Sequence, residues 1–192
     1  MTYNQLIDEL KSYAEEKFAE GEKRIVNDPD LKFLGVRTPL LRRIAKSHEN
    51  DEETFAFPNE YYEVVFIKLA IASKFSYEKL LSRLDELVPL ITNWALCDSA
   101  FKPECIKKNR QDFVPYIKKY MSKEGEFEQR FALIALLSFY VEEEWLDFIK
   151  ECIERCNADL YYTMMSAAWL TAEVLAKHYE YGLSILKSTM CD

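Results

Sequence analysis

Residues 91–100, "ITNWALCDSA", place one carboxylate inside a largely apolar stretch. Asp98 follows Trp94 by four residues, and two helical residues at this spacing lie on one face, a turn apart. An Asp is seldom buried without a partner, and it has a poor helix propensity. The pair therefore indicates a surface that attracts cations through a charge and an indole face. Two structural alternatives stay open, because Asp98 could cap the helix that follows or pair with Arg130.

Two further side chains stand out beside apolar helical segments. Arg130 precedes "FALIALLSFYV", and a guanidinium at the edge of a buried face needs an anion or an aromatic plane. An intramolecular pair with an Asp or Glu is the structural alternative. Trp169 lies in "MMSAAWLTAEVL", eight residues after Tyr161, so the two aromatic side chains can share a face. Packing in the core is the alternative for Trp169.

Basic residues gather in two segments that could follow a phosphate backbone. The segments are "RTPLLRRIAK" and "FKPECIKKNR", and the candidate DNA-binding cations within them are Arg37, Arg42, Arg43, Lys102, Lys107 and Lys108. Such clusters are more often solvated faces than binding sites. They matter here because the chain carries 33 acidic and 25 basic residues, a net charge of −8, so a nucleic-acid partner requires segregated positive charge.

Apolar residues recur with a helical period along almost the whole chain, and no segment alternates with the period of a strand. We predict a helix within residues 2–20, one from an N-cap at Thr38 with Pro39 at its first position, and others capped by Asn59 and Ser76. About ten helices joined by short polar connections favour an all-α fold. Stacked helical pairs, an α-solenoid with a concave face, fit better than a four-helix bundle.

The composition of the 192 residues, 49% of them hydrophobic, predicts one globular domain over residues 1–192. No apolar run approaches the ~20 residues of a membrane span, and the first residues lack the layout of a signal peptide, so we expect a cytoplasmic protein. The five Cys are expected to be reduced. Without a CxxC pair and with only two His, the chain predicts no metal site and no cofactor.

Four segments together resemble the DNA alkylation repair family of HEAT-like-repeat glycosylases, the AlkD-like proteins. They are "FLGVRTPLLRRIAK", "NWALCD", "QRFALIALLSFYV" and "YYTMMSAAWLTAEVLAK", and they occur in the family's order and approximate spacing over about residues 20–180. The resemblance implies a right-handed superhelix of helical pairs whose concave basic face holds duplex DNA. It also implies that the protein cleaves the N-glycosidic bond of N3- or N7-alkylated purines.

The resemblance also assigns roles to single residues. The family's catalytic Asp falls on Asp98 and its W-x-x-x-D Trp on Trp94. Arg130 matches a position that contacts phosphate and shapes the site, and Trp169 matches a late aromatic. An alkylated purine leaves as a neutral base, so the reaction needs a carboxylate that stabilises an oxocarbenium-like sugar. Since no nucleophilic Lys is identifiable, we expect a monofunctional glycosylase without lyase activity. We also expect the protein to be a monomer.

A second hypothesis is a helical-repeat module that binds nucleic acid or protein without excision. Charge distribution separates the two hypotheses: the enzyme is favoured if Arg37, Arg42, Lys102, Lys107, Lys108 and Arg130 converge beside Asp98. An acidic or filled face favours the module. We also predict that Trp94, Asp98, Arg130 and Trp169 line one cleft.

Overall fold

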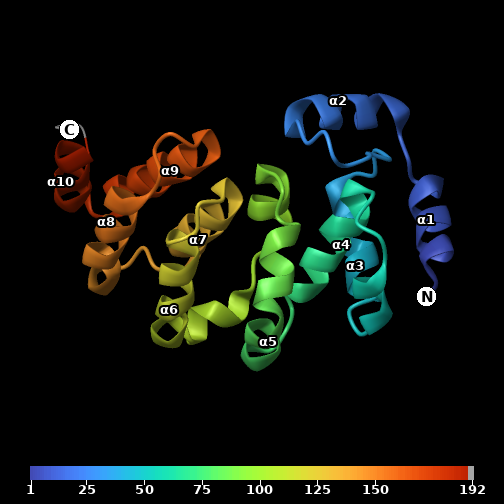
Figure 1. The fold of residues 1–192 in the computed structure, drawn as a ribbon, viewed down its shortest axis with the longest axis horizontal. Helices are drawn as coiled ribbons and strands as arrows, with labels where there is room; N and C mark the ends of the chain where they lie inside the picture. The colour runs from blue at the N-terminus through green and yellow to red at the C-terminus, as the bar shows by residue number, and fades with distance from the viewer. Residues whose placement is uncertain (190–192) are drawn as a thin grey trace. The chain divides into compact units, whose positions relative to one another are not determined.

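The computed structural model describes residues 1–189, and its ribbon is almost entirely helical (Figure 1). The all-α fold of packed helices is therefore confirmed. Within the described residues there is no strand, and one isolated β-bridge joins Lys32 to Tyr61. The α-helices are α1 (Tyr3–Ser12), α2 (Glu16–Val26), α3 (Thr38–Ser47), α4 (Tyr62–Ala72), α5 (Tyr77–Leu87), α6 (Arg110–Met121), α7 (Glu126–Phe139), α8 (Leu146–Arg155), α9 (Tyr161–Lys177) and α10 (Tyr179–Thr189).

The chain divides into two compact units, the first covering Met1–Glu104 and the second beginning at Cys105. Each has its own set of buried apolar side chains. The single domain over residues 1–192, the right-handed superhelix and its concave face stay predictions.

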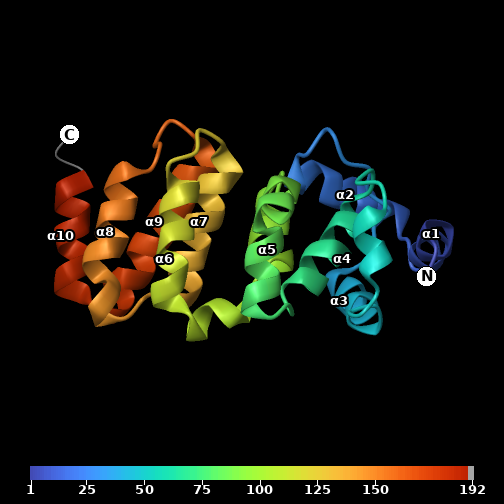
Figure 2. The same ribbon diagram turned by 60° about the horizontal axis from the view of Figure 1, so that its bottom comes forward.

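In the second unit the helices form two layers (Figure 2). Contacts run from α6 to α8 and on to α10 in one layer, and from α7 to α9 in the other. Helices α6 and α7 also contact each other, as do α8 and α9. Consecutive helices therefore pair across the two layers, which is the arrangement expected of a helical-repeat protein.

The first unit is organised around α4, whose sides are nearly all buried. Its apolar side chains point to all sides, which is typical of a helix enclosed by protein. It contacts α3, α5 and the short helix η3 (Leu96–Ala100). Since η3 carries Asp98, the central helix of this unit directly supports the candidate catalytic turn.

A buried carboxylate on α4 holds the "FLGVR" loop. Oε1 of Glu63 accepts hydrogen bonds from the backbone amides of Leu34, Gly35 and Val36, at 2.9, 2.7 and 3.3 Å. Gly35 has a φ of +82°, and a Cβ there would lie 2.4 Å from the carbonyl oxygen of Glu15. Only glycine allows the loop to approach α2 this closely. The loop in turn leads into α3 and its basic residues.

The helix predicted within residues 2–20 is in fact two helices. The chain leaves the helical path after Ser12, and the amide of Glu15 donates to the carbonyl of Gly35 at 3.1 Å. This tertiary hydrogen bond interrupts a pattern that reads as continuous, so α2 starts at Glu16.

Two of the predicted caps are wrong and one is confirmed. The N-cap of α3 is Arg37, which makes no side-chain capping bond, so Thr38 is already helical. Asn59 does not cap α4; its Oδ1 accepts a 2.7 Å hydrogen bond from the buried Lys68, while the bridge between Lys32 and Tyr61 keeps the preceding backbone extended. Ser76 caps α5, since its Oγ accepts from the amide of Lys79 at 3.3 Å.

Glu22 on α2 makes the stability of the first unit dependent on pH. Burial, and then the charge of Glu63, raise the pKa of Glu22 to about 7. The unfolded chain releases this proton near pH 4.5, whereas the folded chain keeps it up to about pH 7, so stability falls as pH rises through this window. The variant Glu22→Gln has no proton to release, so it does not lose stability in this way. We expect it to be more stable than the wild type at pH 8 by about 1 kcal/mol, a value reduced for solvent screening.

Urea unfolding at pH 5 and pH 8 measures this gain. Glu20→Gln is the matched control, because Glu20 lies on the same helix, is exposed and loses the same charge. A gain that is equal at both pH values, or equal in the control, contradicts the assignment.

Candidate functional site

Asp98 lies on a turn of π-helix. In η3 the amide of Phe101 donates to the carbonyl of Leu96, five residues earlier, at 3.2 Å. Short π segments inside helices are rare and are frequently found at functional sites. Asp98 and the preceding Trp94 are both half-buried, whereas Leu96 and Cys97 are buried. The segment therefore turns its apolar side inward and leaves the acid and the indole at the surface.

Buried hydrogen bonds fix the start of this turn. Oδ1 of Asn93 accepts from the amide of Leu96 at 3.0 Å, and its Nδ2 donates to Oδ2 of Asp28 at 2.9 Å. The hydroxyl of Thr92 donates to the same carboxylate oxygen at 2.6 Å. Asp28 and Asn93 are 5% and 2% exposed. Because buried polar groups resist losing their partners, this network resists movement of the turn.

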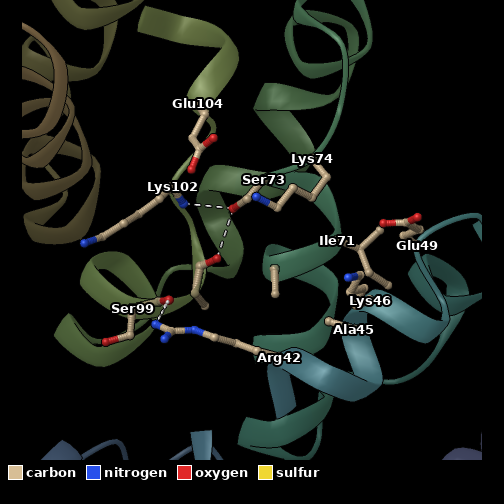
Figure 3. A pocket seen from close by; sticks show the side chains of 12 residues that line it. Arg42, Ala45, Lys46, Glu49, Ile71, Ser73, Lys74, Ser99, Lys102 and Glu104 are labelled. Carbon is tan, nitrogen blue, oxygen red and sulfur yellow. Dashed lines mark hydrogen bonds between the residues drawn. The ribbon is translucent and has the colours of Figure 1, made fainter. Parts of the chain in front are cut away.

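The end of the turn is held from α3 and from the end of α4. Oγ of Ser73 lies 3.0 Å from the carbonyl oxygen of Ala100 and accepts from the amide of Lys102 at 2.8 Å. Nη2 of Arg42 donates to the carbonyl of Ser99 at 3.2 Å. Figure 3 shows Arg42 extending from α3 to Ser99 and the two bonds that meet at Ser73. Asp98 thus lies between two anchored ends.

The structure separates the basic residues predicted to bind DNA. Arg42 and Lys102 line a cavity together with Ser99, next in sequence to Asp98 (Figure 3). Arg37 instead forms a two-pronged ion pair with Glu15, at 2.6 and 2.8 Å, and lies 4.8 Å from the ring centre of Phe18. It would have to exchange this carboxylate for a phosphate.

The other predicted cations are exposed. Arg43 lies 5.6 Å from the ring centre of Tyr13. Lys107 and Lys108 are exposed on the short helix η4 (Glu104–Lys108). Lys46 and Lys74 also line the cavity beside Ser99. Lys46 belongs to the basic segment "RTPLLRRIAK" and lies four residues after Arg42, on the same helix face. Sequence reasoning missed Lys74, which lies outside both basic segments.

Arg130 belongs to the second unit, where it is buried and joins α7 to α9. Its Nη1 donates to the carbonyl of Tyr162 at 2.7 Å, and its guanidinium lies 5.9 Å from the ring centre of that tyrosine. The amide of Tyr162 donates to Oε1 of Glu126 at 2.5 Å. Both backbone groups of Tyr162 are thus held by α7, so Arg130 helps to fix the start of α9.

Trp169 is 47% exposed, so it is not packed in the core. Tyr161, on the same helix, is 60% exposed, and Met165 between them is 45% exposed. At intervals of four residues these side chains form an apolar strip along α9. Sequence reasoning missed Met165, although its spacing gave the signal. That Trp94, Asp98, Arg130 and Trp169 share one cleft stays a prediction.

Within residues 1–189 no group of three or more His, Cys, Asp or Glu side chains could hold a metal ion. Cys97, Cys105, Cys152 and Cys156 are not joined in disulfides, and burial raises the pKa of Cys152 to about 12. None of the helices described is both long and apolar enough to cross a membrane.

A family model described as DNA alkylation repair enzyme matches residues 6–171. The match covers most of the chain and includes every candidate residue named above, so the protein belongs to this family of helical DNA alkylation repair enzymes. A comparison with curated proteins gives no significant match.

Asn93 offers a test of how firmly the Asp98 turn is held. Asn93→Ala removes both a cap of the turn and a donor to Asp28, leaving a buried charge poorly satisfied. We expect a loss of about 1–3 kcal/mol in the free energy of unfolding, measured by urea denaturation. Thr92→Ala serves as the control, because the exposed Thr92 can be replaced by water and should cost less. Equal effects of the two variants would contradict the anchoring role of Asn93.

Proposed function

We propose that this member of the family is a DNA glycosylase that removes N3- or N7-alkylated purines from duplex DNA. The observation that carries the proposal is the geometry of Asp98. Asp98 is half-buried on a turn whose two ends are hydrogen-bonded to buried residues; it follows Trp94 by four residues and precedes Ser99, which lines a basic cavity. A fixed negative charge of this kind is suited to stabilise a positive charge that develops during reaction.

The chemistry follows from the charge of the lesion. A purine alkylated at N3 or N7 already carries a positive charge, so breaking its bond to C1′ releases a neutral base without a general acid. Positive charge then develops on the deoxyribose, as in other glycosidic cleavages. Asp98 stabilises that charge and orients a water whose oxygen bonds to C1′. The proton released from the water passes to the carboxylate or to solvent, leaving an abasic site.

Aromatic side chains complement this role. An indole face attracts a cation by about 0.5–2 kcal/mol, and Trp94 lies one turn before Asp98. In the second unit, Tyr161 and Trp169 are exposed and able to contact the DNA. Arg130 acts by holding the start of α9, and so the helix that carries them. We assign no amine as a nucleophile, and the buried Lys68 is held by Asn59 and the carbonyl of Phe57. The proposed enzyme therefore hydrolyses without cutting the strand.

The variant Asp98→Asn tests the catalytic charge. It keeps the size of the side chain and removes its charge, so we expect excision to fall about a hundredfold or more while folding and DNA affinity change little. The measurement is single-turnover release of 7-methylguanine or 3-methyladenine from methylated duplex DNA, alongside thermal melting. Asp8→Asn is the control, because Asp8 is exposed on α1 and loses the same charge. A large drop in melting temperature with unchanged excision per folded molecule would make Asp98 a structural residue.

Salt dependence tests how the DNA is bound. The proposed contacts are Lys and Arg side chains, with few amide side chains suited to read base edges. Each phosphate contact contributes about −0.9 to the slope of log affinity against log salt, so with about four contacts the affinity falls about tenfold for each doubling of salt. Fluorescence anisotropy across a potassium chloride series measures the slope. Changing the sequence away from the lesion should have little effect, and an affinity insensitive to salt would contradict phosphate binding.

A further inference from the structure

The cavity beside the Asp98 turn is lined mainly by basic residues, although the protein as a whole is acidic. Its volume is about 470 Å³, and it lies between α3, the end of α4 and η3. Four of its lining residues are cationic, Arg42, Lys46, Lys74 and Lys102, against two carboxylates, Glu49 and Glu104. The whole chain carries −8. The excess of positive charge is thus concentrated beside the residue to which we assign catalysis.

The lysines that line this cavity form no ion pair with a carboxylate of the described residues. Within residues 1–189 no ion pair involves Lys46, Lys74 or Lys102, although Glu49 and Glu104 lie on the same cavity. Other lysines of the first unit are paired, such as Lys32 with Glu60 and Lys79 with Glu52. Several unpaired cations around one concavity repel each other, and an anion bound among them relieves that repulsion.

We propose that this cavity binds a backbone phosphate of the damaged strand, next to the deoxyribose on which Asp98 acts. The inference rests on the proposed function and adds a location for one phosphate. A phosphate flanks every deoxyribose in a strand, so a sugar that reaches Asp98 brings a phosphate within reach of the adjoining cavity. Asp98 and the cavity adjoin at Ser99, which follows Asp98 in the chain and lines the cavity.

Arg42 gives this phosphate a direct connection to the catalytic turn. One of its five N–H donors is used on the carbonyl of Ser99, and the planar guanidinium has further donors suited to phosphate oxygens. A phosphate held by Arg42 is therefore joined through one side chain to the residue that follows Asp98. Lys46 and Lys74 supply point charges without such a bond, so they should influence affinity more than rate.

The first experiment measures binding to a duplex that carries a tetrahydrofuran abasic analogue, which the enzyme cannot cleave. We compare the wild type with Lys46→Gln/Lys74→Gln across a potassium chloride series. The expected result is about a tenfold loss of affinity at 100 mM salt, with a salt slope shallower by about 0.9, the value of one phosphate contact. Lys11→Gln/Lys17→Gln is the matched control, since both residues are exposed in the same unit and lie outside the cavity. An unchanged slope in the cavity variant overturns the proposal.

A second arm distinguishes DNA from free phosphate as the ligand. Melting temperatures of the wild type and the cavity variant are compared in inorganic phosphate and in chloride at equal ionic strength. If phosphate stabilises only the wild type while the DNA salt slope is the same in both proteins, the cavity binds the free anion and the proposal fails. The proposed function has a separate outcome: a shallower slope in the cavity variant, together with no excision by the wild type, supports the phosphate site and refutes the glycosylase.

The third measurement tests the link to the turn. Arg42→Lys keeps the positive charge and loses the planar fork of donors. We expect single-turnover excision at saturating DNA to fall about tenfold, while affinity changes less than threefold. Arg24→Lys, the same substitution at an exposed arginine of α2 that lies outside the cavity, should leave the rate at saturation within twofold of the wild type. A normal rate in Arg42→Lys, or equal losses in both variants, overturns the role of Arg42.

Discussion

The candidate site depends on the hydrogen bonds made to the carboxylate of Asp28. This carboxylate is almost fully buried and receives hydrogen bonds from Thr92 and Asn93, residues 64 and 65 positions further along the chain. A buried charge is costly unless it is satisfied, so folding selects the conformation in which these donors reach it. Asn93 is thereby oriented to cap the turn of Asp98. The buried carboxylate of Asp28, which takes no part in the proposed reaction, thus fixes the position of Asp98, to which we assign catalysis.

Net charge is a poor guide to the surface of this protein. Many of its carboxylates form ion pairs with neighbouring cations, as Glu15 does with Arg37 and Glu52 with Lys79. Such pairs produce little electrostatic field at the distance of an approaching polyanion. The cations of the cavity beside Ser99 are not neutralised in this way. A chain of −8 can therefore present a positive surface to DNA where it matters, because the field near a concavity is set by the groups that line it.

The helices were largely predictable from the sequence, and so was the candidate acid. Apolar periodicity marks the buried sides of helices, and Asp98 was conspicuous because a carboxylate there has no packing role. The failures occur where a distant residue decides the local structure. The amide of Glu15 donates to the carbonyl of Gly35 and so interrupts a stretch with helical periodicity. Asn59 accepts a hydrogen bond from the buried Lys68 and therefore does not cap α4. Apolar periodicity predicts neither the π turn nor the position of Lys74 at the cavity, because both depend on how distant segments of the chain pack together.

The position of the tryptophans has a spectroscopic consequence. Trp169 is nearly half exposed on α9, Trp94 is half-buried on the Asp98 segment, and Trp145 is half-buried with an indole nitrogen that has no hydrogen-bond partner among the described residues. Indole emission shifts to longer wavelength, and is quenched more readily by solutes, as the ring meets water. Proteins that retain a single one of these tryptophans would therefore emit differently. Each would report separately on its own surroundings when DNA arrives, without any attached dye.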